Sequence, residues 1–213
     1  MAKYPIYLEL SGRRAVVIGA GAVALRKVQA LVEAGARVTV VAEHIPANVQ
    51  EDFVSRNVEV VISSYSKNYL VGATLCIAAT NDLLLNQRIY ADCQALEVLC
   101  NVVDQPQLCD FFVPAVVKRG SLQIAIGTEG HCPAYAGHLR KKLEEIFTDA
   151  HGQFAEELEK VRRHIITEIP NPDQRKAILG ELTSDESFEY FTSHGTEKWH
   201  EHCRGRICQV QQS

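Results

Sequence analysis

The sequence lacks any apolar run that could cross a membrane, and it lacks an excess of basic charge. Its longest apolar run, residues 15–25, is about half as long as the roughly 20 residues that a membrane-spanning helix needs. Lys and Arg number 22 against 26 Asp and Glu, so the formal net charge is −4, unlike the strongly positive charge typical of nucleic-acid-binding proteins. Pro5 and Glu9 interrupt the region after Lys3, so no secretory signal peptide is expected. We therefore expect neither a membrane nor a nucleic-acid partner.

Cysteine is present, but not in the pattern of a secreted disulfide framework. Such frameworks are short and even-numbered, whereas 7 cysteines are scattered through these 213 residues. Several of them fall in apolar stretches, where a thiol behaves as a small hydrophobic side chain. The sequence therefore predicts reduced cysteines and a cytoplasmic location.

The first hundred residues alternate between short β-branched runs and helical patterns. The predicted strands are nearly continuous runs of valine, isoleucine and alanine, which is typical of parallel strands buried on both faces. Gly35 lies where the first predicted helix would end. The predicted strands are residues 14–18, 37–42, 58–63, 74–79 and 98–103, and the predicted helices are residues 22–34 and 81–96. This order predicts an α/β fold of the Rossmann-like type, with a doubly wound parallel sheet.

The pattern changes after residue 113. Two β-like runs, residues 111–118 and 121–127, are followed by a helix after Pro133, and only helical patterns occur from residue 149 onward. An isolated hairpin is marginally stable in water, so we expect it to pair with a second copy and form a homodimer. The predicted division is a Rossmann domain over residues 1–113, a dimerisation or connecting unit over residues 114–148 and a C-terminal helical domain over residues 149–213.

A glycine-rich loop follows the first predicted strand and opens the first predicted helix. Gly19 permits a tight turn, Gly21 lets the backbone approach a pyrophosphate, and Ala24 is small enough for close packing of helix on strand. The amides of Ala22 and Val23 belong to the helix N-terminus, where an anion is favoured. A simple packing turn is the alternative, but the order strand, loop and helix favours nucleotide binding.

An acidic side chain follows the second predicted strand. Glu43 can accept hydrogen bonds from ribose hydroxyls and repels a 2′-phosphate, which favours NAD over NADP. A protonated His44 beside it would weaken this discrimination. NAD is therefore the expected coenzyme.

Asp104 ends the last predicted strand of the sheet. Ligands bind beyond the carboxyl ends of the strands in open α/β sheets, so this carboxylate would face the coenzyme. Acidic residues are also common in turns, and a turn cap before Pro106 explains Asp104 equally well. The residues alone leave both alternatives open.

Five stretches, in this order, resemble the siroheme synthase family. They are PIYLEL at residues 5–10, GAGAVALRK at 19–27, AATND at 78–82, NVVD at 101–104 and FFVPA at 111–115. The resemblance is to the family's precorrin-2 dehydrogenase/ferrochelatase module. It covers residues 4–145 well and the later helices only by length and type. It implies a Rossmann domain, a small dimerisation unit and a C-terminal helical domain.

The resemblance also implies an activity. It is the NAD-dependent oxidation of precorrin-2 to sirohydrochlorin, followed in some members by insertion of ferrous iron. Asp104 matches the family's key aspartate and is the candidate catalytic base, and the same carboxylate could accept pyrrole protons during chelation. Thr80, Asn81 and Asn101 are the expected coenzyme-binding residues near the strand ends, although Asn81 and Asn101 could position the substrate instead.

A tetrapyrrole substrate rich in carboxylates requires cationic partners. Arginine can bind a carboxylate through two parallel hydrogen bonds, although any single cation could equally be a solvated surface charge. The available clusters are Arg26-Lys27, Lys118-Arg119 and Arg140-Lys141-Lys142. From these we select Arg26, Lys27 and Arg140 as substrate-binding candidates.

One stretch departs from the family pattern. Members carry a sequence of the type SSGG-x-SP where this chain has residues 127–133, with Glu129 in place of a glycine and Cys132 in place of a serine. Thr128 and His131 are candidate substrate contacts in this stretch. His131 and Cys132 could instead be soft metal ligands, but two neighbouring residues do not make a metal site.

The C-terminal region carries a second group of side chains that resembles a metal site. Their spacing fits no standard zinc site, and a solvated terminus is the simpler interpretation. We therefore predict no metal ligand. The residues concerned are His194, His200, His202, Cys203 and Cys208.

Two other functions remain compatible with the sequence. An NAD-sensing regulatory domain would bind NAD without turnover and would need neither an acid at position 104 nor a helical substrate domain. A chelatase without dehydrogenase activity would keep the tetrapyrrole site.

Overall fold

The computed structural model describes residues 3–211, and the chain folds into two compact units. The first unit ends at Val113 and the second begins at Pro114. Each unit has a hydrophobic core of its own, as expected of a domain. No helix in the described part of the chain is long and apolar enough to span a membrane.

The first unit contains a five-stranded parallel sheet with the strand order β3-β2-β1-β4-β5. The strands are β1 (Arg14–Ile18), β2 (Arg37–Ala42), β3 (Glu59–Ile62), β4 (Leu75–Ala78) and β5 (Leu99–Val102). Val16 of β1 pairs with Thr39 of β2 on one side and with Cys76 of β4 on the other. The strand order therefore reverses beside β1, and the predicted Rossmann-like α/β fold is confirmed.

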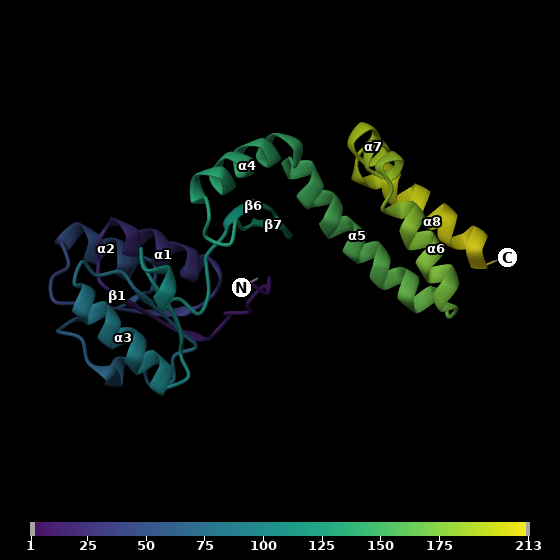
Figure 1. Ribbon diagram of the computed structural model, residues 1–213. Coiled ribbons are helices and arrows are strands. Elements are labelled where there is room, and N and C mark those ends of the chain that lie inside the picture. Colours follow the sequence, from purple (N-terminus) through teal and green to yellow (C-terminus); the bar gives the residue numbers. More distant parts are fainter. Residues whose placement is uncertain (1–2, 212–213) are drawn as a thin grey trace. The chain divides into compact units, whose positions relative to one another are not determined.

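Helices cover both faces of this sheet (Figure 1). They are α1 (Ala22–Glu33), α2 (Ala47–Ser55) and α3 (Leu83–Ala95), with the short 3₁₀ helices η1 (Lys67–Leu70) and η2 (Pro106–Leu108). Val17 packs with Val28 of α1 and Phe53 of α2. Its neighbour Val16 packs on the opposite face with Ile89 of α3. Both faces are buried, which explains why the strand sequences are almost continuously apolar.

Two elements differ from the prediction, a helix within the first unit and the strand that follows it. The helix α2 is absent from the sequence-based assignment, because its apolar side consists of little more than Val49 and Phe53. The strand predicted from residue 111 begins only at Ala115, since Pro114 has no amide hydrogen for a strand ladder. The chain before it instead follows the edge of β5, where the Asp110 amide donates to the Cys100 carbonyl at 2.8 Å.

The second unit combines a β-hairpin with a series of helices (Figure 1). They are β6 (Ala115–Arg119), β7 (Leu122–Ile126), α4 (Pro133–Ile146), α5 (Asp149–Glu168), α6 (Pro172–Leu182), α7 (Asp185–His194) and α8 (Thr196–Gln211). Near its start, α5 approaches the hairpin so closely that a Cβ at Gly152 would lie under 3.0 Å from the Arg119 carbonyl oxygen. Further along α5, Ile165 is buried in the helical core. The helix α5 therefore packs against the hairpin near its start and contributes to the helical core further along.

The C-terminal region is a packed helix, so the prediction of a solvated terminus is wrong. Trp199, Cys203 and Ile207 recur every four residues along α8, and all three are buried. The Trp199 ring lies 5.3 Å from that of Phe154, centroid to centroid, and its indole N–H donates to Ser187 Oγ at 2.9 Å. The many charged residues between these positions conceal the apolar period of four.

Replacing Trp199 with alanine should lower the free energy of unfolding by about 3–5 kcal/mol, the usual cost of truncating a buried large aromatic side chain. The exposed neighbour Lys198 provides a matched control, and Lys198→Ala should change this free energy by less than about 0.5 kcal/mol. Urea unfolding followed by far-ultraviolet circular dichroism measures both. Equal midpoints for the two variants would mean that α8 does not contribute to the core.

Candidate coenzyme and active site

The candidate residues of the first unit follow the carboxyl ends of neighbouring strands. Ala78 of β4 pairs with Ile18 of β1 on one side and Val102 of β5 on the other, so these strands end level with one another. The loops that begin there carry Gly19 after β1, Glu43 after β2, Thr80 after β4 and Asp104 after β5. The structure therefore brings these four candidates to one edge of the sheet, where open α/β sheets bind ligands.

Gly19 is required by its protein neighbours. Its φ of +108° is a conformation that favours glycine. A Cβ at this position would lie under 3.0 Å from the Ala79 carbonyl oxygen, and the Gly19 amide donates to the Val41 carbonyl at 2.8 Å. Gly19 thus joins the end of β1 to both neighbouring strands.

Gly21 is not required by protein packing. A Cβ there would meet no atom within 4 Å, and its φ of −76° suits any residue. Gly21 is the N-cap of α1, where no side chain caps the helix and the first turn has no acidic residue. The first-turn amides, including those of Ala22, Val23 and Ala24, therefore have no partner within the helix. Open space beside unpaired amides fits the pyrophosphate of a dinucleotide.

Glu43 and Thr80 flank the glycine loop, but among the described residues only the Thr80 side chain has hydrogen-bond partners. Glu43 is exposed, and its carboxylate has no ion pair or hydrogen bond within residues 3–211, so it can accept hydrogen bonds from a ribose. The Thr80 hydroxyl donates to Asn86 Oδ1 at 2.7 Å, and Asn86 Nδ2 donates to the Thr80 carbonyl at 3.1 Å. Asn86 is only 2% exposed. Sequence reasoning missed it, although an asparagine on the buried side of a predicted helix was an available signal.

Asp104 lies in a tight turn with a left-handed backbone. Its φ is +61°, and the Gln105 amide closes the turn on the Val102 carbonyl at 3.2 Å. Glycine or asparagine usually occupies such positions, and another residue there costs about 1 kcal/mol or more. The Asp104 side chain is exposed and accepts no hydrogen bond from the described residues, so turn capping does not account for it. Strain of this kind clusters at functional sites, which favours the catalytic alternative.

The two asparagines expected at this edge have different surroundings. Asn101 is 9% exposed, and its Nδ2 donates to the Phe111 carbonyl at 2.8 Å. Asn81 is exposed in the loop after β4. Asn101 therefore orients the returning chain, whereas the Asn81 side chain has no hydrogen bond to a described residue.

Arg26 and Lys27 are neighbours on α1 but face different surroundings. Arg26 is exposed and lines an open cavity of about 580 Å³ together with Asp52 and Arg56 of α2. Lys27 is half-buried, and burial together with the nearby Arg26 guanidinium lowers its pKa. The nearby Cys109, in the loop after β5, acts on this pKa in the opposite direction. Lys27 therefore lies near the loop after β5, which also carries Asp104.

Thr128 and His131 lie in the second unit, in the loop between β7 and α4. The Thr128 carbonyl accepts the His131 amide at 2.8 Å, and its hydroxyl accepts the Cys132 amide at 3.2 Å. Glu129 has a φ of +53°, which a glycine would adopt without strain. The departure from the family pattern therefore places a carboxylate at a position whose backbone suits glycine.

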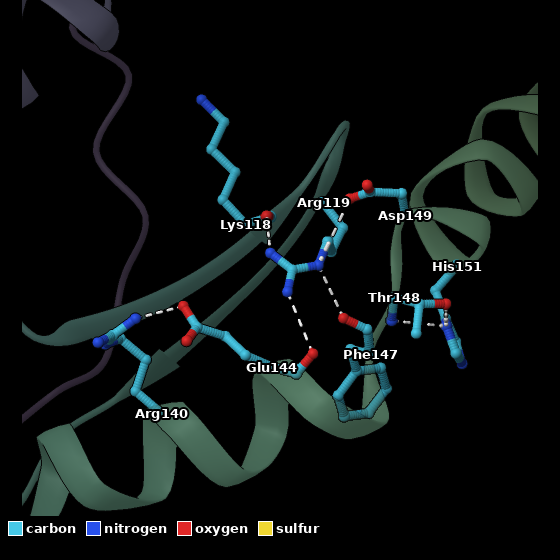
Figure 2. A network of polar contacts seen from close by, with 8 residues as sticks. All are labelled: Lys118, Arg119, Arg140, Glu144, Phe147, Thr148, Asp149 and His151. Carbon is cyan, nitrogen blue, oxygen red and sulfur yellow. Dashed lines mark hydrogen bonds and ion pairs between the residues drawn. The ribbon is translucent and has the colours of Figure 1, made fainter.

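Arg119 is occupied by contacts within the second unit (Figure 2). Its Nε donates to the Phe147 carbonyl at 2.8 Å and its Nη2 to the Glu144 carbonyl at 3.1 Å, at the C-terminal end of α4. Its Nε also lies 3.5 Å from the Asp149 carboxylate. The Lys118 carbonyl accepts Arg119 Nη1 at 3.0 Å, whereas the Lys118 side chain extends away from this network (Figure 2). Arg119 therefore joins the hairpin to the end of α4 and is not a free substrate cation.

Arg140 forms an ion pair with Glu144, one turn further along α4 (Figure 2). Pairs with this spacing on helices contribute only about 0.3–0.5 kcal/mol. A substrate carboxylate would therefore compete with Glu144 for Arg140 at little cost.

The histidines of the C-terminal helices do not converge on one point. His200 Nε2 lies 2.7 Å from Glu157 Oε2, whereas His194 and His202 lie against the Tyr190 ring with centroid separations of 4.1 and 5.3 Å. Within residues 3–211, no group of three or more His, Cys, Asp or Glu side chains is arranged to hold a metal ion. These side chains contribute to helix packing.

Comparison with known proteins agrees with the resemblance found in the sequence. A family model described as "Putative NAD(P)-binding" matches residues 6–115. The siroheme synthase of Psychrobacter arcticus is 37% identical over 176 residues, covering 83% of this chain and 32% of that protein. The siroheme synthase of Actinobacillus pleuropneumoniae serotype 3 is 34% identical over 188 residues, covering 88% of this chain and 39% of that protein. The chain thus spans about a third of the length of the curated relatives it matches.

One solved structure is similar over the whole chain. It is that of "SirC, precorrin-2 dehydrogenase", which matches with a TM-score of 0.76 and 22% identity, covering 99% of this chain and 100% of that chain. This likeness supports the fold of both units.

Gly19→Ala and Gly21→Ala should separate the two roles of the glycine loop. Gly19→Ala should lower the thermal unfolding midpoint, because the methyl group would collide with the Ala79 carbonyl at a positive φ. Gly21→Ala should leave the midpoint nearly unchanged and weaken NAD binding, because its methyl group would fill the open space beside the helix N-terminus. Thermal unfolding and fluorescence titration with NAD measure these effects. Wild-type NAD affinity in Gly21→Ala would contradict the assignment.

Proposed function

We propose that this chain, which belongs to the NAD(P)-binding family whose model matches residues 6–115, is an NAD-dependent precorrin-2 dehydrogenase. The observation that carries this proposal is Asp104, whose exposed, unpaired carboxylate is held in a strained turn at the coenzyme edge. Its relatives are named siroheme synthases, which supports a tetrapyrrole as the substrate.

Different residues at the sheet edge have the roles of binding the coenzyme and accepting a proton. The first-turn amides of α1 beside Gly21 bind the pyrophosphate, and Glu43 accepts hydrogen bonds from the ribose and disfavours a 2′-phosphate. NAD, when bound, supplies the hydride acceptor. Asp104 accepts the proton that precorrin-2 loses as its conjugation extends to give sirohydrochlorin. Oxidation of the substrate by two electrons is thereby balanced by one hydride and one proton.

Cations hold the substrate carboxylates in this proposal. Lys27 suits this role because it is half-buried near the loop after β5, and a charge pair is stronger where water is partly excluded. Arg26 and Arg140 are further candidates, Arg140 in competition with Glu144. Thr128 and His131 would contact the substrate from the loop after β7.

Ferrous iron insertion is a second activity that the same carboxylate can support. Iron is then a substrate, and Asp104 accepts the pyrrole protons that leave as the metal enters. A purely NAD-sensing domain is disfavoured, because coenzyme binding gives no reason for an unpaired carboxylate in a strained turn.

All seven cysteines are free thiols, which is compatible with a reducing cytoplasm.

The central test is substitution of Asp104. With precorrin-2 under anaerobic conditions, Asp104→Asn should lower the rate of NADH formation by roughly 10²–10⁴-fold, the contribution of a positioned base. NAD affinity should barely change. Asp104→Gly should be equally slow, yet at least as stable as the wild type, because glycine relieves the positive φ.

Glu97→Gly is the matched control for Asp104→Gly. Glu97 also has a positive φ, +55°, but lies before β5 rather than after it. Its replacement should relieve similar strain and leave NADH formation unchanged. A normal rate in Asp104→Asn would overturn the assignment of the base while the fold stands.

We also propose a homodimer formed through the hairpin. Val117 is buried against the helices of its own unit, whereas Val116 on the opposite face of the hairpin is 38% exposed and pairs across the strands with Ala125. The uncovered face of this two-stranded sheet carries Val116 and Ala125, which a second copy could bury.

Val116→Glu should therefore shift the sedimentation coefficient from that of a dimer to that of a monomer, since it places a charge in the proposed interface. Val54→Glu, at an exposed valine of α2, is the control and should leave the dimer intact. In this proposal the tetrapyrrole site lies between subunits, so the monomer should lose activity. A fully active monomer would refute it.

A further inference from the structure

The loop that carries Asp104 returns along β5 and is closed at its base. Asn101 and Cys109 form an isolated antiparallel bridge. Next to this bridge, the Asp110 amide donates to the Cys100 carbonyl at 2.8 Å, and the Cys100 amide donates to Asp110 Oδ2 at 2.8 Å. These hydrogen bonds hold the two ends of the loop together, but they do not reach its tip, which carries Asp104.

A single side chain reaches both ends of the Asp104 turn. Cys109 Sγ donates to the Val102 carbonyl at 3.2 Å and lies 3.3 Å from the Gln105 carbonyl, which are the first and last residues of the turn. Asn101 Nδ2, at 3.5 Å from the same sulfur, supports it from behind. Burial raises the pKa of the Cys109 thiol, so the sulfur keeps its proton at neutral pH and acts as a donor.

We propose that Cys109 is a positioning residue for Asp104, holding the strained turn in the conformation that directs the carboxylate toward the substrate. A strained backbone persists only where its surroundings over-determine it. The turn itself has one closing bond of its own, from the Gln105 amide to the Val102 carbonyl. The thiol adds one hydrogen bond from outside the turn, and both ends of the turn lie within its reach.

The bonding pattern separates this role from a merely structural one. The Val102 and Gln105 carbonyls each also accept a backbone amide, from Gln105 at 3.2 Å and from Leu108 at 2.9 Å. Loss of the thiol therefore leaves neither carbonyl without a partner, and the fold should tolerate it. The conformation of Asp104, rather than stability, should respond.

The inference rests on the proposed dehydrogenase function, and the test is a double-mutant cycle between Cys109→Ala and Asp104→Asn. Cys109→Ala should lower kcat for NADH formation from precorrin-2 by about 3- to 10-fold, the size expected for one hydrogen bond. NAD affinity and the thermal midpoint should stay close to those of the wild type. Cys109→Ser, which keeps a donor, should restore most of kcat. Cys208→Ala, at an exposed cysteine of α8, should have no effect.

The double variant decides whether Cys109 acts through Asp104. If it does, Cys109→Ala should cause no further loss of rate in the Asp104→Asn background, because residues that act as one unit are not additive. Independent, multiplying losses would overturn the inference, and so would a wild-type kcat in Cys109→Ala while Asp104→Asn is slow. A wild-type rate in Asp104→Asn would instead refute the proposed base itself, and the role of Cys109 with it.

Discussion

The contact between Gly19 and the Ala79 carbonyl sets how closely the ends of β1 and β4 can approach. A Cβ at position 19 would lie under 3.0 Å from that oxygen, so a side chain would push the two strands apart. The strand order reverses here, and the helix that follows β1 packs on one face of the sheet while the helix that follows β4 packs on the other. The crevice at such a reversal is where α/β sheets bind ligands. The open space at Gly21 and the unpaired amides of α1 depend on this geometry.

The non-glycine residues with a positive φ fall into two groups, those that end a helix and those that do not. Within residues 3–211, the non-glycine residues with positive φ are Asn57, Glu97, Asp104 and Glu129. Asn57 and Glu97 each follow the C-cap of a helix, α2 and α3, where a left-handed residue commonly ends the helix. Asp104 and Glu129 follow no helix, so helix termination does not explain them. These two positions fall in the loops that we assign to catalysis and substrate binding.

The fold was largely readable from the sequence, because buried parallel strands and the glycine loop leave strong local signals. The bounds of β1 and β2 agree with the predicted runs. Elements held by sparse or distant contacts were not readable. The helix α2 has a narrow apolar side, and the apolar period of α8 is hidden among charges. Tertiary packing decides such helices more than their own sequence does.

The side-chain partners at the site were the least predictable feature. Residue type and order in the chain placed Gly19, Glu43 and Asp104 at one sheet edge, since the carboxyl ends of parallel strands meet there. The sequence could not show that Arg119 donates its hydrogen bonds to carbonyls at the end of α4. Nor could it show that Asn86 and Cys109 form hydrogen bonds with the loops after β4 and β5. Those roles depend on distances across the fold, and no spacing in the sequence encodes them.

The loop between β7 and α4 is supported on both sides by rigid structure. Its start follows Ile126, which pairs with Ala115 across the hairpin. Its end leads into α4, whose final carbonyls accept the Arg119 guanidinium from the same hairpin. The hairpin thus fixes both the strand that enters the loop and the helix that leaves it. Binding loops need such a scaffold, because a contact that must be ordered on binding loses part of its energy to entropy. A loop held in this way can present Thr128 and His131 to a substrate without first being ordered by it.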